Sequence, residues 1–545
     1  MTIAEPLSEL ILRLHGRPMP ELDRAIHALC TALEDGHVCL PITEIGLSPA
    51  DLQRASSVVG APGEFKPLIL DEAGRLYLHR YWRYERQLAL ALRARAIAPT
   101  CPFDPALLQA GLDRHFAGAD AAQRAAASGF VQRPLGLITG GPGTGKTRTA
   151  AMAMVLLAEQ WAAEGRHARC ALAAPTGKAA ARLAQSLAAT LEKIDLPPAT
   201  RALLPTSAST LHRLLGSRPG TTTFRHHAEN PLGLDALIVD EASMVALPLM
   251  ARLLAALQPS TRLLLLGDPH QLASVEAGHV LGDLCASPLR TCVTELVKNY
   301  RFSGASGIFQ LSRAVNEGAR ERVEELLATP PPDLAAAPLP VPSALPAALR
   351  ASVLEGYRPF LQAATPRAAL DAFDAFRILT PLREGPYGVG YLNRLAEQVL
   401  AGAGLIEPEH AYYAGRPILI LRNDATLGLF NGDIGIIRRD DDGELRAFFP
   451  DDAGGVRALA PARLPEHETA FAMTVHKSQG SEFHRVLIVL PESDSPILSR
   501  ELLYTAVTRA REAVALWWSE AALTASLERR VTRWSGLVEQ LGASE

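Results

Sequence analysis

Short apolar runs alternate with helix-forming stretches between residues 111 and 289. Four of these runs, each of four or five residues, cover 135–139, 170–174, 236–239 and 262–266. Apolar strands that alternate with helices predict a parallel sheet with helices on both faces. Ligand sites in such a sheet lie at the carboxyl ends of the strands, which is where polar residues follow these runs. We therefore expect an α/β domain over 111–289, with a small insertion at about 205–232.

The amino-terminal region has a helical pattern instead. Apolar residues recur every three or four positions in two stretches, 7–14 and 22–33, and Gly36 is a suitable carboxyl-terminal cap. These patterns predict a mostly helical module over residues 1–110. The segment 75–82 places three aromatic residues among basic ones. Such a cluster can stack on bases, but we favour a half-buried strand or a protein interface, which makes this a partner-docking module.

The second half of the chain predicts another α/β domain that is interrupted by a β-rich segment. Seven prolines between Pro330 and Pro346 indicate a linker or surface excursion. Strand patterns resume at 376–380 and 486–490. Between them, three short β-rich runs and the turn sequence Asp442-Gly443 predict a small inserted β-barrel at 413–465. The second α/β domain would then comprise 290–412 and 466–545.

Bulk composition narrows the class of protein. The 545 residues are 48% hydrophobic and 21% charged, which is typical of a globular protein of several domains. No apolar run approaches the roughly 20 residues that span a bilayer, so we expect no membrane partner. The six cysteines lack zinc-site spacing, and the amino terminus lacks a secretory pattern. A cytoplasmic location is expected. Because the net charge is −4, any nucleic-acid site must be a local basic groove.

A glycine-rich loop lies between the first apolar run and a helix-forming stretch. This strand–loop–helix setting is the one that the phosphate-binding P-loop requires. It predicts a site for ATP and Mg²⁺, in which Lys146 bridges the β- and γ-phosphates and Thr147 is a magnesium ligand. The predicted nucleotide-binding residues are Gly140, Gly141, Pro142, Gly143, Thr144, Gly145, Lys146, Thr147 and Arg148.

Further candidate catalytic residues follow later strands. Asp240 and Glu241 come directly after the run 236–239, where Asp240 can hold Mg²⁺ and Glu241 can orient and deprotonate the attacking water. Gln271 follows the next run and is a candidate sensor of the γ-phosphate. Arg301 and Arg509 are candidates for the arginines that neutralise charge in the transition state, with surface ion pairs as the alternative.

Eight polar or glycine-containing blocks follow one another in a fixed order, at 140–147, 174–180, 210–215, 239–243, 267–272, 300–301, 474–483 and 504–511. Four further segments accompany them, namely 36–40, 76–82, 386–393 and 429–435. The eight blocks resemble the motifs of superfamily 1 DNA helicases. The four segments extend this resemblance, within that superfamily, to the RecD family, the α subunits of exodeoxyribonuclease V (RecBCD).

The resemblance implies two RecA-like domains with ATP between them, 5′ to 3′ movement on single-stranded DNA, and an SH3-like inserted barrel beside the DNA. It assigns Gln123 to adenine, although an exposed helix residue is an equal alternative from the sequence alone. Gln479 would couple the DNA path to the nucleotide. The residues that it places along the DNA are Thr176, Lys178, His212, Thr474 and His476. Hydroxyl, amide and backbone groups suit contacts that are independent of base sequence.

The function that follows is an ATP-dependent 5′ to 3′ DNA helicase subunit. The resemblance implies that it acts on single- and double-stranded DNA ends in a heterotrimer with RecB-like and RecC-like subunits, in recombinational repair of double-strand breaks and degradation of linear DNA. Two alternatives stay open: an autonomous RecD-like helicase, and a structural docking subunit with a dispensable ATPase. The chain shows no convincing nuclease cluster, since Glu64-Phe65-Lys66 lacks a placed aspartate. Exonuclease activity would therefore belong to the holoenzyme.

Overall fold

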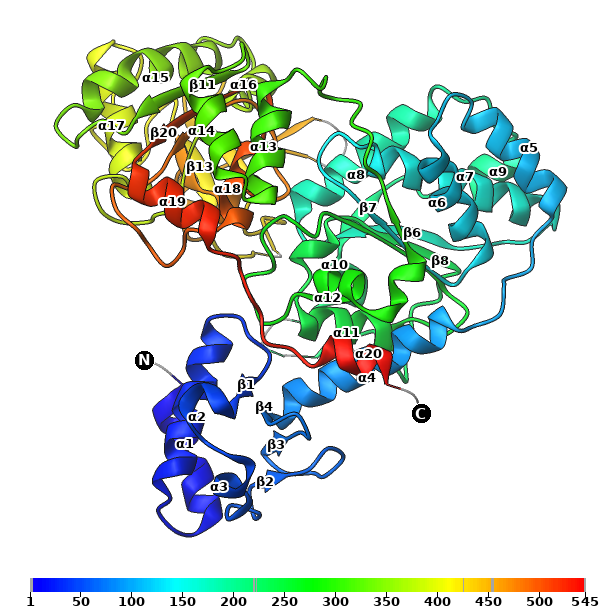
Figure 1. The fold of residues 1–545 in the computed structure, drawn as a ribbon. Coiled ribbons are helices and arrows are strands. Elements are labelled where there is room, and N and C mark those ends of the chain that lie inside the picture. The colour runs from blue at the N-terminus through cyan, green and yellow to red at the C-terminus, as the bar shows by residue number, and fades with distance from the viewer. Residues whose placement is uncertain (1–2, 219–220, 222, 425, 452–454, 544–545) are drawn as a thin grey trace.

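Figure 1 shows the computed structural model, which describes residues 3–218, 221, 223–424, 426–451 and 455–543. Two α/β units, the first cyan to green and the second green to red, lie above a smaller blue amino-terminal module. Positions 219, 220 and 222 of the predicted insertion lie outside the described residues. In the part of the chain that is described, no helix has the length and apolar character needed to cross a membrane.

The first α/β unit contains a six-stranded parallel sheet. All four predicted strands are present within one residue of their expected ends. A fifth and a sixth, β7 and β10, lie at the two edges. In spatial order the strands are β10 (Val293–Glu295), β5 (Leu135–Thr139), β9 (Arg262–Gly267), β8 (Ala236–Val239), β6 (Cys170–Ala174) and β7 (Ala208–Thr210). Because β10 pairs with β5, the first sheet extends past the expected domain boundary at residue 289.

Helices cover both faces of this sheet, so its strands are apolar on both sides. On β9, Leu263 and Leu265 face one core cluster, and Leu264 and Leu266 face the other. Helix α7 is buried at every position from Thr149 to Trp161, since it packs between the sheet and neighbouring helices. The helices are α5 (Pro105–His115), α6 (Ala121–Gln132), α7 (Lys146–Ala163), α8 (Gly177–Leu191), α9 (Pro198–Ala202), α10 (Leu211–Leu215), η2 (Ala242–Met244), α11 (Leu247–Ala256), α12 (Val280–Ala286) and η3 (Pro288–Cys292).

The second α/β unit has a five-stranded parallel sheet. In spatial order its strands are β11 (Leu334–Pro338), β20 (Ala510–Trp518), β19 (Phe483–Val489), β12 (Phe376–Thr380) and β18 (Ala472–Thr474). Around it are α13 (Gly307–Glu317), α14 (Arg320–Ala328), α15 (Leu345–Leu361), α16 (Pro366–Phe373), α17 (Val389–Gly402), η5 (His476–Ser478), α18 (Arg500–Val507) and α19 (Glu520–Glu528).

The proline-rich stretch is a correction to the sequence prediction. The sequence predicts a linker or surface excursion without packed structure, but residues 334–338 form β11 and pair with β20. Proline is compatible with this position because β11 is an edge strand, and Pro338 is its last residue. The sequence rule failed because proline excludes a central strand but not an edge one.

The inserted segment forms an antiparallel five-stranded sheet. Its strands, in spatial order, are β16 (Val456–Leu459), β15 (Leu445–Pro450), β14 (Ile434–Arg439), β13 (Pro417–Ile420) and β17 (His467–Thr469), with η4 (Pro461–Arg463) before β17. The turn at Asp442-Gly443 joins β14 to β15, and Gly443 has the left-handed φ of 83° that such a turn requires. Since β17 pairs with β13, the insert extends to Thr469, past the expected end at 465.

The amino-terminal module is mostly helical, as the sequence predicts, and it also contains a small sheet that the sequence does not predict. Alongside α1 (Ala4–His15), α2 (Pro20–Glu34), η1 (Ile42–Ile45) and α3 (Pro49–Gln53), it contains a four-stranded sheet in the order β1 (Leu40–Pro41), β4 (Arg75–Leu78), β3 (Leu68–Leu70) and β2 (Val59–Gly60). These strands have two to four residues, too few to show an alternating pattern. The aromatic segment 75–82 divides into β4 and the start of α4 (His79–Ala96), and α4 packs against α11 of the first α/β unit.

The chain ends outside the second α/β unit, although residues 466–545 were assigned to it. After α19, residues 529–542, which we call the C-terminal strap, run back to the amino-terminal module and end in α20 (Leu537–Gly542), beside α4 and α12 (Figure 1). The Trp534 ring stacks on His37, with centroids 4.0 Å apart. The Ser535 hydroxyl and the Gly536 N–H both donate to Oε1 of the buried Glu85, at 2.7 and 3.0 Å.

Candidate functional site

The glycine-rich loop follows β5 and leads into α7, as the sequence predicts. Gly140, Gly143 and Gly145 have φ values of 147°, 81° and 86°, a region that favours glycine. A Cβ on Gly140 would lie 2.4 Å from the carbonyl oxygen of Leu296, so a larger residue has no room there. The loop therefore has the backbone conformation that turns successive N–H groups toward an anion.

The Lys146 ammonium lies against this loop. Its Nζ donates to the carbonyl oxygens of Gly140 and Gly141, at 2.6 and 3.1 Å. Arg148, two residues further on α7, is exposed. Lys146 is thus held next to the loop by backbone groups that a bound phosphate can replace as its partners.

The acidic pair follows the buried strand β8. The Thr147 hydroxyl donates to Oδ2 of Asp240 at 3.2 Å, which brings the two predicted magnesium ligands together. Glu241 has a φ of 52° and is the non-glycine residue with positive φ among those the structure describes. Backbone strain of this kind concentrates at functional sites. Burial, and then the neighbouring charge of Asp240, raise the pKa of Glu241.

Gln271 and Arg509 join the two α/β units. Arg509 begins on the second unit and is 2% exposed, and its Nη2 donates to Oε1 of Gln271 at 2.9 Å. Gln271 in turn donates through Nε2 to Oδ2 of Asp268 at 3.2 Å. Burial lowers the pKa of Arg509, while the charges of Glu241 and Glu482 act in the opposite direction. An arginine buried beside carboxylates at a domain junction is not the surface ion pair of the alternative interpretation.

Arg301 is held beside the P-loop by its neighbour Asn299. The Asn299 amide donates through Nδ2 to the carbonyl oxygen of Pro142 at 2.8 Å, and its Oδ1 accepts from the Arg301 N–H at 2.9 Å. A Cβ on Gly143 would lie 2.6 Å from the Cβ of Arg301. The guanidinium then extends to Glu482, with 3.1 Å between Nη2 and Oε1.

Gln123 is buried, which differs from the exposed helix residue of the alternative interpretation. Its Nε2 donates to the carbonyl oxygen of Thr144 at 3.4 Å, and its Oε1 accepts from the Tyr300 hydroxyl at 3.3 Å. Gln123 therefore lies against the P-loop, where the family resemblance places a contact to adenine.

Two of the predicted DNA-binding residues, Thr176 and Lys178, lie at the start of α8. The Thr176 hydroxyl caps this helix by accepting from the Ala179 N–H at 3.2 Å. A Cβ on Gly480, in the second unit, would lie 3.3 Å from the Thr176 hydroxyl oxygen. Lys178 donates through Nζ to Asp374 of the second unit at 3.4 Å, and burial lowers its pKa. The start of α8 thus meets the segment after β18.

The other predicted DNA-binding residues divide between two places. Thr474 and His476 lie at the end of β18 and the start of η5, where burial lowers the pKa of His476. His212 lies on α10, with its ring centroid 5.8 Å from that of Phe224. Gln479 donates through Nε2 to the carbonyl oxygen of Leu272 at 2.8 Å, so it contacts the first unit directly after Gln271.

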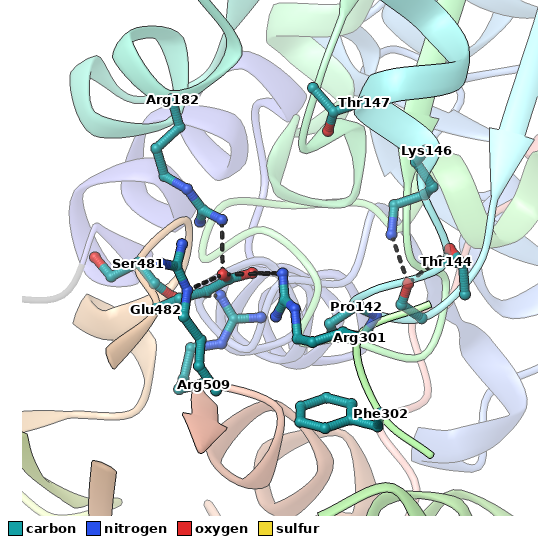
Figure 2. Close-up of polar contacts among 12 residues, drawn as sticks. Pro142, Thr144, Lys146, Thr147, Arg182, Arg301, Phe302, Ser481, Glu482 and Arg509 are labelled. Carbon is teal, nitrogen blue, oxygen red and sulfur yellow. Dashed lines mark hydrogen bonds and ion pairs between the residues drawn. The ribbon is translucent and has the colours of Figure 1, made fainter. Parts of the chain in front are cut away.

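Sequence reasoning assigned no role to Glu482 and did not single out Arg182, yet both are central to the junction (Figure 2). Arg182 follows Lys178 by one helical turn on α8, so its position on the same face as a predicted site residue was a usable signal. Glu482 had no comparable signal, because a single carboxylate in a motif does not reveal how many arginines will surround it.

These observations define a P-loop ATPase of the helicase class. Residues 123–277 match the family model described as an AAA domain, and residues 469–517 match the UvrD-like helicase C-terminal domain. The first α/β unit is thus a nucleotide-binding domain, and the second carries a helicase domain.

Comparison with curated proteins identifies the family. The chain is 39% identical to the RecBCD enzyme subunit RecD of Mycolicibacterium smegmatis, over 97% of this chain and 95% of that protein. It is 34% identical to the RecD subunit of Haemophilus influenzae, over 85% and 80% of the two chains. It is 32% identical to the ATP-dependent RecD2 DNA helicase of Deinococcus radiodurans, over 88% of this chain and 61% of that one. The chain belongs to the RecD family of ATP-dependent DNA helicases.

Proposed function

We propose that this chain is the 5′ to 3′ translocating helicase subunit of a RecBCD-type enzyme. It assembles with RecB-like and RecC-like subunits, engages single- and double-stranded DNA ends, and acts in recombinational repair and in degradation of linear DNA. The main support is the contact between Arg509 and Gln271, which connects the helicase unit to the nucleotide-binding unit. A motor needs such a contact, because hydrolysis in one place must move another.

In this proposal, ATP occupies the P-loop and Gln123 contacts its base. Lys146 leaves the carbonyl oxygens of Gly140 and Gly141 and binds the β- and γ-phosphates. Arg301 and Arg509 neutralise charge on the γ-phosphate, an effect worth about 10³- to 10⁵-fold in rate where arginine fingers have been measured. Gln271 is hydrogen-bonded to Arg509, so a change in the nucleotide that moves Gln271 also moves the second unit.

A magnesium ion fits the residues present. The Thr147 hydroxyl and the Asp240 carboxylate are the hard oxygen ligands that Mg²⁺ prefers, and they lie within hydrogen-bond distance of each other. When bound, the ion would neutralise phosphate charge and help to orient the terminal phosphate. Glu241, next to this pair, orients the attacking water and accepts its proton.

The DNA path runs along the start of α8 and the segment after β18. Thr176 and Lys178 contact the strand from the first unit, and Thr474 and His476 contact it from the second. His212 extends the path on α10. The Phe430 ring of the inserted sheet packs under the Arg213 guanidinium, 4.3 Å from ring centroid to Cζ, which places the insert beside α10. Opening and closing of the junction would move one set of contacts past the other.

The variant K146Q tests the nucleotide site. DNA-stimulated ATP hydrolysis should fall to background, because the amide has no positive charge for the phosphates. The control is K193Q, which removes an exposed lysine two residues after the end of α8 and should hydrolyse ATP as wild type does. Turnover at the wild-type rate by K146Q would rule out the site.

A second candidate function is a docking subunit whose ATPase is dispensable. The contact of α4 with α11 and the C-terminal strap favour it, because both join the amino-terminal module firmly to the motor. A strand-displacement assay on the isolated chain and on the reconstituted complex distinguishes the helicase function from the docking function. A K146Q complex that unwinds DNA from 5′ ends as fast as wild type would support the docking role alone.

A further inference from the structure

Glu482 forms ion pairs with arginines from both α/β units. Its Oε1 accepts from Nη2 of Arg301 at 3.1 Å. Its Oε2 lies 2.9 Å from Nη2 of Arg182 and 2.8 Å from Nε of Arg511. Arg182 is on α8 of the first unit. Arg511 is on β20 of the second unit, and Glu482 also belongs to the second unit, directly before β19. Figure 2 shows the guanidinium groups of Arg182 and Arg301 directed at this one carboxylate.

This carboxylate is ionised although only 9% of its side chain is exposed. Burial alone would raise the pKa of Glu482, but the charges of Arg182, Arg301 and Arg509 and the hydrogen bond from Arg511 hold it well below its usual range. Glu482 is therefore a buried anion whose charge is balanced by several guanidinium groups. Removal of one partner from such a group leaves charge uncompensated, so the arrangement is energetically significant.

The same guanidinium groups lie close to the nucleotide motifs. Arg301 starts beside Gly143 of the P-loop. The charges of Asp240 and Glu241 act on Arg182, and the charge of Glu241 also acts on Arg509. Arg182 and Arg509 are thus within electrostatic range of both Glu482 and Glu241. A terminal phosphate presents oxygens that accept from guanidinium groups in the same way as a carboxylate.

We propose that Glu482 is a positioning residue that holds Arg301 and Arg182 at the junction in place of the terminal phosphate of ATP. Binding of a triphosphate transfers these guanidinium groups from the carboxylate to the phosphate. Glu482 thereby opposes triphosphate binding, but it does not act on a diphosphate, which lacks the competing group. This inference rests on the role of Arg301 in the proposed function and adds a residue that sets its position.

The test is equilibrium binding of a non-hydrolysable ATP analogue and of ADP to the full chain with Mg²⁺. In E482Q, affinity for the analogue should rise by about five- to tenfold, while affinity for ADP stays within about twofold of wild type. The control E355Q removes an exposed glutamate that pairs with Arg485 of the second unit, and both affinities should match wild type. Equal change in both affinities of E482Q, or no change, would overturn the proposal.

The variant R511Q gives an independent test if E482Q does not fold. The Arg511 side chain is 43% exposed and competes with Arg301 and Arg182 for the same carboxylate. Without Arg511, Glu482 forms stronger ion pairs with Arg301 and Arg182, so these two arginines leave it less readily. Affinity for the ATP analogue should therefore fall by about two- to threefold, with ADP affinity unchanged. A gain in analogue affinity would contradict the proposal.

Failure of this inference can be told apart from failure of the proposed function. If E482Q fails to distinguish the two nucleotides while K146Q still abolishes turnover, only the role of Glu482 is wrong. The gain in analogue affinity that E482Q causes should be smaller in the R301Q background. Measured from R301Q to R301Q/E482Q, it should be at most about half of the gain from wild type to E482Q, because one of the two transferred arginines is absent. A merely structural glutamate would show no such coupling.

Discussion

Arg509 and Gln271 are hydrogen-bonded across the junction of the two α/β units, with 2.9 Å between Nη2 and Oε1. The same guanidinium donates through Nη1 to the carbonyl oxygen of Ser481 at 2.9 Å and through Nε to that of Thr505 at 3.2 Å. Three acceptors at fixed positions define the plane of the guanidinium. A side chain held in this way is already oriented toward the first unit.

Replacement of Arg509 by lysine should therefore impair catalysis more than binding. Lysine keeps the charge but cannot donate to three acceptors in one plane. We expect kcat for ATP to fall by at least about 10²-fold, with the Kd of the nucleotide changed by less than about fivefold. Steady-state kinetics and nucleotide binding on the same preparation check this. A kcat for R509K close to that of wild type would show that the charge alone suffices.

Gly140→Ala should abolish nucleotide binding. The new Cβ would lie 2.4 Å from the Leu296 carbonyl oxygen, and the φ of 147° disfavours any other residue. The matched control is Gly129→Ala on α6, where a Cβ meets nothing within 4 Å. Alanine in that helix should stabilise the fold by about 0.5–1 kcal/mol and leave binding intact. Nucleotide titration and thermal unfolding distinguish the two, and normal binding by the Gly140 variant would contradict this reading of the loop.

We expect Asp283 on α12 to make the stability of the protein depend on pH below about 7. Burial raises its pKa to about 7; the Ser535 hydroxyl of the C-terminal strap partly opposes this, and the charges of Glu85 and Glu539 add to it. Because the folded-state pKa exceeds the unfolded one, the folded state binds the extra proton, so stability falls as pH rises toward 7 and levels off above it.

The melting temperature of wild type should therefore drop between pH 6 and pH 8 by more than that of Asp283→Asn. The variant cannot titrate at this position, and the other groups are common to both proteins. Thermal unfolding at the two pH values measures the difference. Identical drops in the two proteins would mean that Asp283 titrates normally in the fold.

Trp534→Ala should loosen the amino-terminal module. The ring stacks on His37. The backbone N–H of Trp534 donates to Nδ1 of His37, and its backbone carbonyl accepts from the Val38 N–H, at 2.8 Å each, so these two bonds remain available in the variant. Loss of the half-buried ring should cost about 2–3 kcal/mol. Limited proteolysis should then cleave the module before the two α/β units. The control Trp517→Phe, on β20, should leave the module as resistant as in wild type.

The sequence was sufficient for the four central strands of the first sheet and for the P-loop, because buried parallel strands are continuous apolar runs and the loop has a rigid spacing. It was insufficient where tertiary contacts decide the structure. The strand at 334–338 depends on pairing with β20, which proline content concealed. The short strands of the amino-terminal module had no periodicity to detect. The arginines around Glu482 come from three segments far apart in the chain, so no local pattern could reveal them.

The C-terminal strap has a consequence for biosynthesis. The ribosome makes His37 497 residues before its stacking partner Trp534. Glu85 likewise receives its donor from Ser535 only 450 residues later, and Gly536 follows directly. This part of the amino-terminal module thus acquires these contacts long after its own synthesis, and a nascent chain that stalls before the strap leaves a buried carboxylate without these two donors.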